Sequence, residues 1–185
     1  MSLTVEALQI ADVKLITPAR FGDERGYFCE TYNAARFQAA GIDAEFVQDN
    51  HSLSAKAGTL RGLHFQAPPF AQAKLVRVVR GAILDVAVDV RKASPTYGQW
   101  VKAELSAENG AQLFVPHGFL HGFVTLVPDT EVVYKVDAYY SRECDGAVKW
   151  NDAALGIDWG VDPASITLSA KDAAAQEFSS FQSPF

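Results

Sequence analysis

Apolar and polar residues alternate in short segments between Tyr27 and Trp150, and this two-residue period predicts β-strands. Glycine, proline, aspartate and asparagine separate the segments and predict turns between them. Many short strands at this spacing are typical of an all-β sandwich or barrel, and they argue against repeated strand–helix–strand units. The six clearest strands are expected at Lys74–Val79, Ile83–Val90, Gln99–Leu105, Gln112–Val115, Phe119–Leu126 and Glu131–Tyr139.

Helical patterns are sparse in this chain. One short helix is expected over Asn33–Ala40, with Asn33 as its N-cap and Gly41 ending it. A second helix is expected from Ser169 to about Phe178. No internal repeat, low-complexity tract or change in composition marks a linker, so residues 1–185 are predicted to form one domain.

The alternation also predicts which polar side chains point inward. Tyr134 shares a strand face with two valines, Lys74 shares its face with two valines of another strand, and His121 shares its face with two phenylalanines. Polar groups that point into an apolar interior are candidates for a binding or catalytic site.

Charge and composition exclude several classes of protein. The 185 residues carry 16 Lys and Arg against 22 Asp and Glu, a net charge of −6, which argues against a nucleic-acid binder. No apolar run approaches the roughly 20 residues that a membrane helix needs, and the N-terminus does not resemble a signal peptide. We therefore expect a cytoplasmic protein without membrane partners, in which Cys29 and Cys144 are reduced thiols.

The segment Gly110–His121 fits the pattern G(x)5-P-x-G-x-x-H, which resembles the second motif of the cupin jelly rolls. Metal-binding cupins add an earlier H-x-H…E cluster, because a divalent metal needs three or four converging donors. The corresponding segment here, Gly58–Gln66, contains a single histidine, His64. A metal site is therefore disfavoured, no cofactor is expected, and an organic acid–base site is favoured in its place.

Further motifs make the resemblance specific to one family. LRGLHFQ at Leu60–Gln66, QAKLV at Gln72–Val76 and PHGFLHGF at Pro116–Phe123 occur in the order found in the dTDP-4-dehydrorhamnose 3,5-epimerases. The chain resembles this family from about Phe21 to Asp172. The resemblance implies an all-β, cupin-like jelly roll (a β-sandwich or barrel) with a few short peripheral helices.

The resemblance also implies a reaction and a catalytic set. The family's substrate is a dTDP-4-keto-6-deoxyhexose, which is inverted at C3 and C5 to give dTDP-4-dehydro-L-rhamnose for dTDP-L-rhamnose biosynthesis. His64 matches the base, Asp172 the carboxylate that orients it, Tyr134 the acid on the opposite face and Lys74 the cation near the keto oxygen. Proton transfer beside a ketone needs these groups and no metal or redox cofactor.

Substrate-binding positions and a homodimer with shared pocket residues are implied in the same way. Asp145 stands where the family has glutamate, one methylene longer, and Leu120 replaces a smaller residue. The matching binding positions are Arg25, Glu30, Gln48, Asn50, Arg61, Lys74, His121, Asp145 and Lys171.

Several of these residues also have structural interpretations. Asp172 lies three residues after Ser169, as in a capping box, and Arg25 lies in a turn beside acidic residues. Arg61 and His64 have opposite parity, so a regular strand directs only one of them into a given pocket. Either Gly62 marks a bulge, or Arg61 serves a pocket completed elsewhere. Tyr134 could be a buried tyrosine bonded to the backbone, and His121 part of a cavity wall. Structural roles are predicted for four more residues: His51, His117, Asp85 and Asp89.

Three other functions remain open from the residues alone. A relative that inverts only C3 or only C5 of a related dTDP-4-keto-deoxysugar, or that acts on a differently deoxygenated sugar, needs the same base and acid. Spacing therefore does not separate it from a double epimerase. A metal-dependent cupin is disfavoured by the missing ligand cluster. A non-catalytic sugar-nucleotide binder is disfavoured because both His64 and Tyr134 are present.

Overall fold

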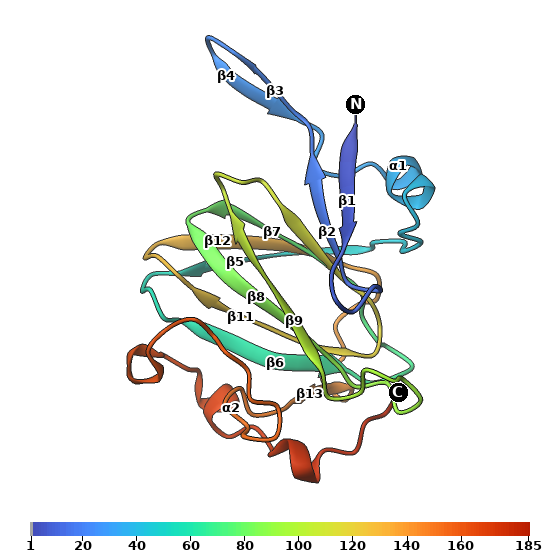
Figure 1. Cartoon of the computed structure of the whole chain (residues 1–185), viewed down its shortest axis with the longest axis vertical. Coiled ribbons are helices and arrows are strands. Elements are labelled where there is room, and N and C mark those ends of the chain that lie inside the picture. Colours follow the sequence, from blue (N-terminus) through green and yellow to red (C-terminus); the bar gives the residue numbers. More distant parts are fainter. Residues whose placement is uncertain (1) are drawn as a thin grey trace.

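The computed structural model describes residues 2–185 as two antiparallel sheets that face each other (Figure 1). The larger sheet contains, in spatial order, β1 (Leu3–Ala7), β2 (Lys14–Pro18), β10 (Gln112–Val115), β7 (Lys74–Arg80), β12 (Thr130–Val136) and β5 (Gln48–Ser54). The smaller sheet contains β13 (Asp145–Ala147), β6 (Leu60–Gln66), β11 (Phe119–Thr125), β8 (Ala82–Asp89) and β9 (Trp100–Ser106). The predicted all-β sandwich is confirmed.

The remaining elements lie outside the sandwich. β3 (Arg20–Asp23) and β4 (Gly26–Cys29) form a hairpin that stands away from both sheets (Figure 1). The helices are α1 (Ala34–Ala39), α2 (Ala170–Ala173) and two 3₁₀ turns at Pro163–Ser165 and Phe178–Ser180.

The six expected strands are confirmed as β7, β8, β9, β10, β11 and β12. Most of their ends agree within one residue, but β12 ends at Val136 and does not reach Tyr139. The expectation that strands begin near Tyr27 is wrong, because β1 and β2 pair at one edge of the larger sheet. The sequence pattern does not predict strand β5, because its inward positions hold the polar residues Gln48, Asn50 and Ser52.

Side chains between the two sheets form the central core. The larger sheet contributes Val76, Leu113 and Val132, and the smaller sheet contributes Ala87 and Phe123. Tyr134 packs partly buried against this cluster, as its predicted inward parity requires. The core between the two sheets therefore consists mainly of apolar side chains.

A second apolar layer covers the outer face of the smaller sheet. Leu120 and Val124 of β11 pack there against Trp159 and Phe181 of the C-terminal segment. Every residue of β11 is consequently buried. Leu120, the bulky substitution noted in the sequence, points into this layer and away from the central core.

Of the two expected helices, one is confirmed and one is too long. Asn33 caps α1 by accepting a hydrogen bond from the Arg36 amide, and Gly41 follows the helix with φ +78°. The second helix ends at Ala173, because Gln176 forms an isolated parallel β-bridge with Val148, the residue that follows β13. Tertiary pairing thus overrides the helical pattern expected as far as Phe178.

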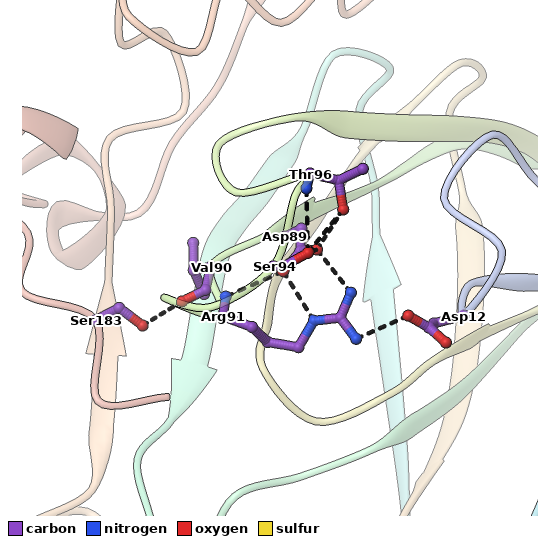
Figure 2. A network of polar contacts seen from close by, with 7 residues as sticks. All are labelled: Asp12, Asp89, Val90, Arg91, Ser94, Thr96 and Ser183. Carbon is purple, nitrogen blue, oxygen red and sulfur yellow. Dashed lines mark hydrogen bonds and ion pairs between the residues drawn. The ribbon is translucent and has the colours of Figure 1, made fainter.

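Hydrogen bonds to a buried carboxylate stabilise the loop after β8 (Figure 2). Asp89, whose side chain is fully buried, accepts hydrogen bonds from Arg91 Nε at 2.9 Å, Ser94 Oγ at 2.6 Å and Thr96 Oγ1 at 2.6 Å. Burial raises the pKa of Asp89, but these bonds outweigh it and hold the pKa well below its usual range. Arg91 also reaches Asp12, at 2.7 Å, so this network joins the loop to the N-terminal segment.

Two further observations bear on the sequence expectations. No helix within residues 2–185 is both long enough and apolar enough to cross a membrane. Cys29 and Cys144 are both free thiols.

Candidate active site

A cavity of about 390 Å³ lies between the two sheets and is closed on one side by the segment that contains α2. Seven of the residues expected from the sequence line it: Arg61, His64, Lys74, His121, Tyr134, Lys171 and Asp172. A second cavity, of about 310 Å³, lies among Val133, Lys135 and Arg77 on the other face of the larger sheet. We place the chemistry in the first cavity, because the candidate base and acid meet there.

The candidate base is held by a carboxylate far away in the sequence. His64 Nε2 donates to Asp172 Oδ1 at 2.5 Å, across 108 positions of the chain. Burial raises the pKa of Asp172, but the bond and charge of His64 outweigh it and lower the pKa overall. Asp172 is therefore ionised at neutral pH, fixes the tautomer of His64 and leaves the other ring nitrogen free to accept a proton.

Asp172 also takes part in the N-terminal cap of α2, whose N-cap residue is Ser169. The amide of Asp172 donates to Ser169 Oγ at 3.1 Å, and the Ser169 hydroxyl donates back to Asp172 Oδ2 at 2.8 Å. One carboxylate oxygen thus serves the cap and the other serves His64. The helix start positions the carboxylate for the histidine.

A bulge in β6 brings Arg61 and His64 to the same cavity. His64 lies opposite His121 and Arg61 lies opposite Phe123, so two residues of β6 face a single residue of β11, Gly122. The extra residue changes the parity of the strand. This confirms the bulge that the sequence suggested at Gly62.

The bulge requires two glycines. Gly62 has φ +135°, and a Cβ atom on it would lie 2.5 Å from the Cα of Gly122. A Cβ on Gly122 would lie 2.9 Å from the carbonyl oxygen of Arg61. Any larger residue at either position would force β6 and β11 apart.

Tyr134 and Lys74 come from the opposite sheet. Both belong to the larger sheet, on β12 and β7, whereas His64 belongs to the smaller one. Burial raises the pKa of Tyr134, so the phenol keeps its proton at neutral pH. Burial lowers the pKa of Lys74 to about 8, an effect that the charges of Asp85 and Asp145 partly offset.

His121 is buried beside a second carboxylate. Its Nε2 lies 2.6 Å from Oδ1 of Asp85, whose side chain is fully buried. Burial lowers the pKa of His121, and the neighbouring Asp85 only partly offsets this. The imidazole is therefore neutral at neutral pH and belongs to the cavity wall.

Three other expected residues, Asp145, Asn50 and Gln48, are linked to the cavity through the residues that they contact. Asp145 forms an ion pair with Lys171 and accepts a hydrogen bond from the Tyr140 hydroxyl, so the shorter acid still reaches its lysine. Asn50 lies opposite Tyr134 in the sheet and accepts a hydrogen bond from Gln48 Nε2 at 2.9 Å.

Arg25 and Glu30 are not brought to this cavity within one chain. Arg25 lies at the turn of the protruding hairpin, where its side chain is 83% exposed and forms an ion pair with Asp23. Glu30 follows the hairpin and pairs with Arg36 at 3.0 Å. The expected local ion pair of Arg25 is confirmed, and its expected contact with substrate would need another chain.

Sequence reasoning did not identify several polar residues that the structure places at or near the cavity, among them Asp85, Ser52, Thr59 and Thr167. Asp85 was predicted to be only structural, although an acid at an inward position of a largely apolar strand was a signal of a buried partner. Ser52 lines the cavity, but its orientation could not be inferred while β5 was not predicted as a strand.

In the described part of the chain, no group of three or more His, Cys, Asp or Glu side chains is arranged to hold a metal ion. The cavity brings together an imidazole–carboxylate pair, a phenol and several cations. Such a set is suited to removing a proton beside a carbonyl group and returning one from the other side.

Comparison with known proteins points to one family. The family model described as dTDP-4-dehydrorhamnose 3,5-epimerase matches residues 7–180. The chain is 59% identical over 167 residues to the dTDP-4-dehydrorhamnose 3,5-epimerase of Sinorhizobium fredii, covering 90% of this chain and 85% of that protein.

Solved structures agree with this assignment. The 3,5-epimerase RmlC of Legionella pneumophila in complex with dTDP-4-keto-L-rhamnose superimposes with a TM-score of 0.93 at 43% identity, covering 98% of this chain and 95% of that one. ChmJ, a 3'-monoepimerase of Streptomyces bikiniensis in complex with dTDP-quinovose, is more distant, with a TM-score of 0.84 at 34% identity, covering 94% and 87%. The chain thus has the cupin-like jelly roll and belongs to the dTDP-4-dehydrorhamnose 3,5-epimerase family of isomerases.

Proposed function

We propose that this protein inverts C3 and C5 of dTDP-4-dehydro-6-deoxy-D-glucose and so forms dTDP-4-dehydro-L-rhamnose for dTDP-L-rhamnose biosynthesis. The observation that carries the proposal is one cavity with the His64–Asp172 pair on one wall and Tyr134 with Lys74 on the other. The similarity to 3,5-epimerases over nearly the whole chain supports the choice of substrate.

His64 is the base in this mechanism. The C4 ketone acidifies the hydrogens on C3 and C5, and the free ring nitrogen of His64 removes one of them. The imidazolium that forms is stabilised by the ionised Asp172 at 2.5 Å. The electron pair of the broken C–H bond moves to the keto oxygen as an enolate.

Lys74 and Tyr134 complete each inversion. Lys74, whose pKa of about 8 leaves it mostly protonated at neutral pH, stabilises the enolate oxygen by its charge. Tyr134 then donates its proton to the carbon from the face opposite His64, and exchange with solvent removes the proton from His64 and returns one to Tyr134 before the second inversion. The location of the two residues on opposite sheets supports removal and return of the proton on opposite faces.

Cations near the cavity would hold the diphosphate. Arg61 and Lys171 line the cavity, and Arg61 offers a planar guanidinium that suits phosphate oxygens. Gln48, Asn50, His121 and Asp145 would make further polar contacts with the nucleotide and sugar.

The active form in this proposal is a homodimer. The hairpin exposes Phe21, Tyr27 and Phe28 by 50%, 63% and 60%, and it carries Arg25 away from its own cavity. Aromatic residues on a protruding hairpin are suited to an interface with a second copy, which would bring Arg25 and Glu30 to the neighbour's site. We propose in addition that residues 1–185 act as a single domain, in the cytoplasm.

The test is solvent exchange followed by NMR. Incubation with dTDP-4-dehydro-6-deoxy-D-glucose in deuterated water should place deuterium at both C3 and C5. Deuterium at only one of these carbons would favour the second candidate, a mono-epimerase such as the similar ChmJ. Absence of label at both carbons would overturn the proposed function.

A further inference from the structure

Ser52 carries a buried hydroxyl group that the protein leaves without a partner. Its Oγ atom is inaccessible to solvent and has no hydrogen-bond partner anywhere in residues 2–185. Buried polar groups in folded proteins are nearly always paired, because an unpaired one lowers stability. Ser52 lines the cavity described above and is partly exposed, so rotation about its Cα–Cβ bond would turn the unpaired hydroxyl towards a ligand bound there.

The strand register places this hydroxyl beside the candidate acid. Ser52 lies opposite Val132 and Asn50 lies opposite Tyr134, so Ser52 is the next inward residue along β5 after the one that faces Tyr134. Across the sheet, Val132 pairs with Val78. These valines offer no group that could bond the serine.

Arg61 lies on the other side of Ser52. The next inward residue of β5, Ser54, accepts a hydrogen bond from Arg61 Nε at 3.4 Å, and Arg61 also donates to the Leu53 carbonyl at 3.2 Å. Ser54 is thus already paired, whereas Ser52 is free. Ser52 lies between a candidate phosphate-binding cation and the candidate acid.

We propose that Ser52 is a specificity-determining residue whose hydroxyl bonds the C2 hydroxyl of the hexose, an inference that rests on the proposed function. Arg61 would hold the diphosphate attached to C1, and Tyr134 acts at C3 and C5. The hydroxyl between these points is the one on C2. Its configuration is unchanged by the reaction, so the contact persists through both inversions.

This contact would distinguish 2-hydroxy sugars from 2-deoxy sugars. A site built to bond a hydroxyl rejects an analogue without it, because the site's own polar group is then left unpaired. Serine suits this role because its hydroxyl both donates and accepts.

The test compares Ser52→Ala with the wild type on two substrates, the 4-keto-6-deoxyglucose nucleotide and its 2-deoxy analogue, with deuterium incorporation as the readout. Ser52→Ala should lower kcat/KM for the 2-hydroxy substrate by about tenfold and leave that for the 2-deoxy analogue within about twofold. The ligand-free variant should have a Tm equal to or above that of the wild type, because an unpaired buried hydroxyl has been removed.

Ser54→Ala is the matched control. It removes a hydroxyl that is already bonded to Arg61, so it should lower Tm and affect both substrates alike. Equal losses on both substrates for Ser52→Ala, or a lowered Tm without a change in the substrate ratio, would overturn the proposal for Ser52. A wild type that exchanges neither carbon would instead overturn the proposed function, and this inference with it.

Discussion

At the scale of single residues, the two walls of the cavity differ in the protonation that burial and charge impose. Asp172 has a lowered pKa and is ionised, whereas Tyr134 has a raised pKa and keeps its proton. This asymmetry supports the proposed base on one wall and the proposed acid on the other.

Two substitutions separate these roles. His64→Asn should abolish deuterium exchange at both carbons, since an amide does not accept the proton. Tyr134→Phe should slow complete inversion by roughly a hundredfold while proton abstraction continues, because only the return step loses its acid. Solvent exchange and product formation, both followed by NMR, measure the two steps.

His117→Asn provides the control for these variants. This histidine is half exposed and pairs with Asp137 at 2.9 Å, so its replacement should leave turnover within about twofold of the wild type. Exchange that survives in His64→Asn would remove that residue from the role of base. Equal slowing of both steps in Tyr134→Phe would contradict an acid on the opposite wall.

At the scale of elements, the course of β6 determines which side chains meet. Without the bulge, Arg61 and His64 would lie on opposite faces of the strand. The glycines at positions 62 and 122 allow β6 and β11 to approach closely enough for the bulge to form. A local backbone irregularity therefore brings the candidate base and a candidate binding cation to one cavity.

The loop after β8 is stabilised by the Asp89 network, and its stability should depend on pH. The folded-state pKa of Asp89 lies below that of the unfolded chain, so its contribution is present above about pH 4 and is lost as the pH falls further. Asp89→Asn should lower the free energy of unfolding by about 3 kcal/mol at pH 7, because it leaves Arg91 without its buried partner.

Asp12→Asn is the control for this network. Asp12 contacts the same Arg91 at 2.7 Å but is 58% exposed, and an exposed ion pair contributes only about 0.2–1 kcal/mol. Urea unfolding at pH 7 and at pH 3 measures both variants. The gap between wild type and Asp89→Asn should narrow at pH 3, and a gap that widens there would contradict the assigned pKa direction.

At the scale of the whole molecule, the protruding hairpin leaves the proposed site without one of its cations. Arg25 is 83% exposed at the turn of that hairpin, beyond the sandwich (Figure 1). A site completed by a second copy would make activity depend on the dimer. Light scattering of the purified protein should therefore give the mass of a dimer.

Mixed dimers test whether Arg25 acts in the neighbouring subunit. Arg25→Ala and His64→Asn should each be nearly inactive alone. When they are mixed and allowed to exchange subunits, about a quarter of the wild-type activity should return, because half of the dimers then have one intact site. No recovery would show that Arg25 acts within its own chain, and a monomeric protein would contradict the dimer.

The sequence by itself determined the features that depend on neighbouring residues. Alternation within β12 was sufficient for the inward face of Tyr134, and the Asn33 cap was sufficient for α1. The three motifs LRGLHFQ, QAKLV and PHGFLHGF were sufficient only together to indicate the family. Strand parity, helix capping and each sequence motif depend only on a few consecutive residues.

Only the tertiary structure decided which distant groups meet. The hydrogen bond between His64 and Asp172 joins residues 108 positions apart. The Ser52 hydroxyl is unpaired because no segment that packs around it places a hydrogen-bonding group within reach. The early end of the second helix likewise follows from the bridge between Gln176 and Val148. These features arise when separate segments pack and exclude water, and no local pattern encodes that arrangement.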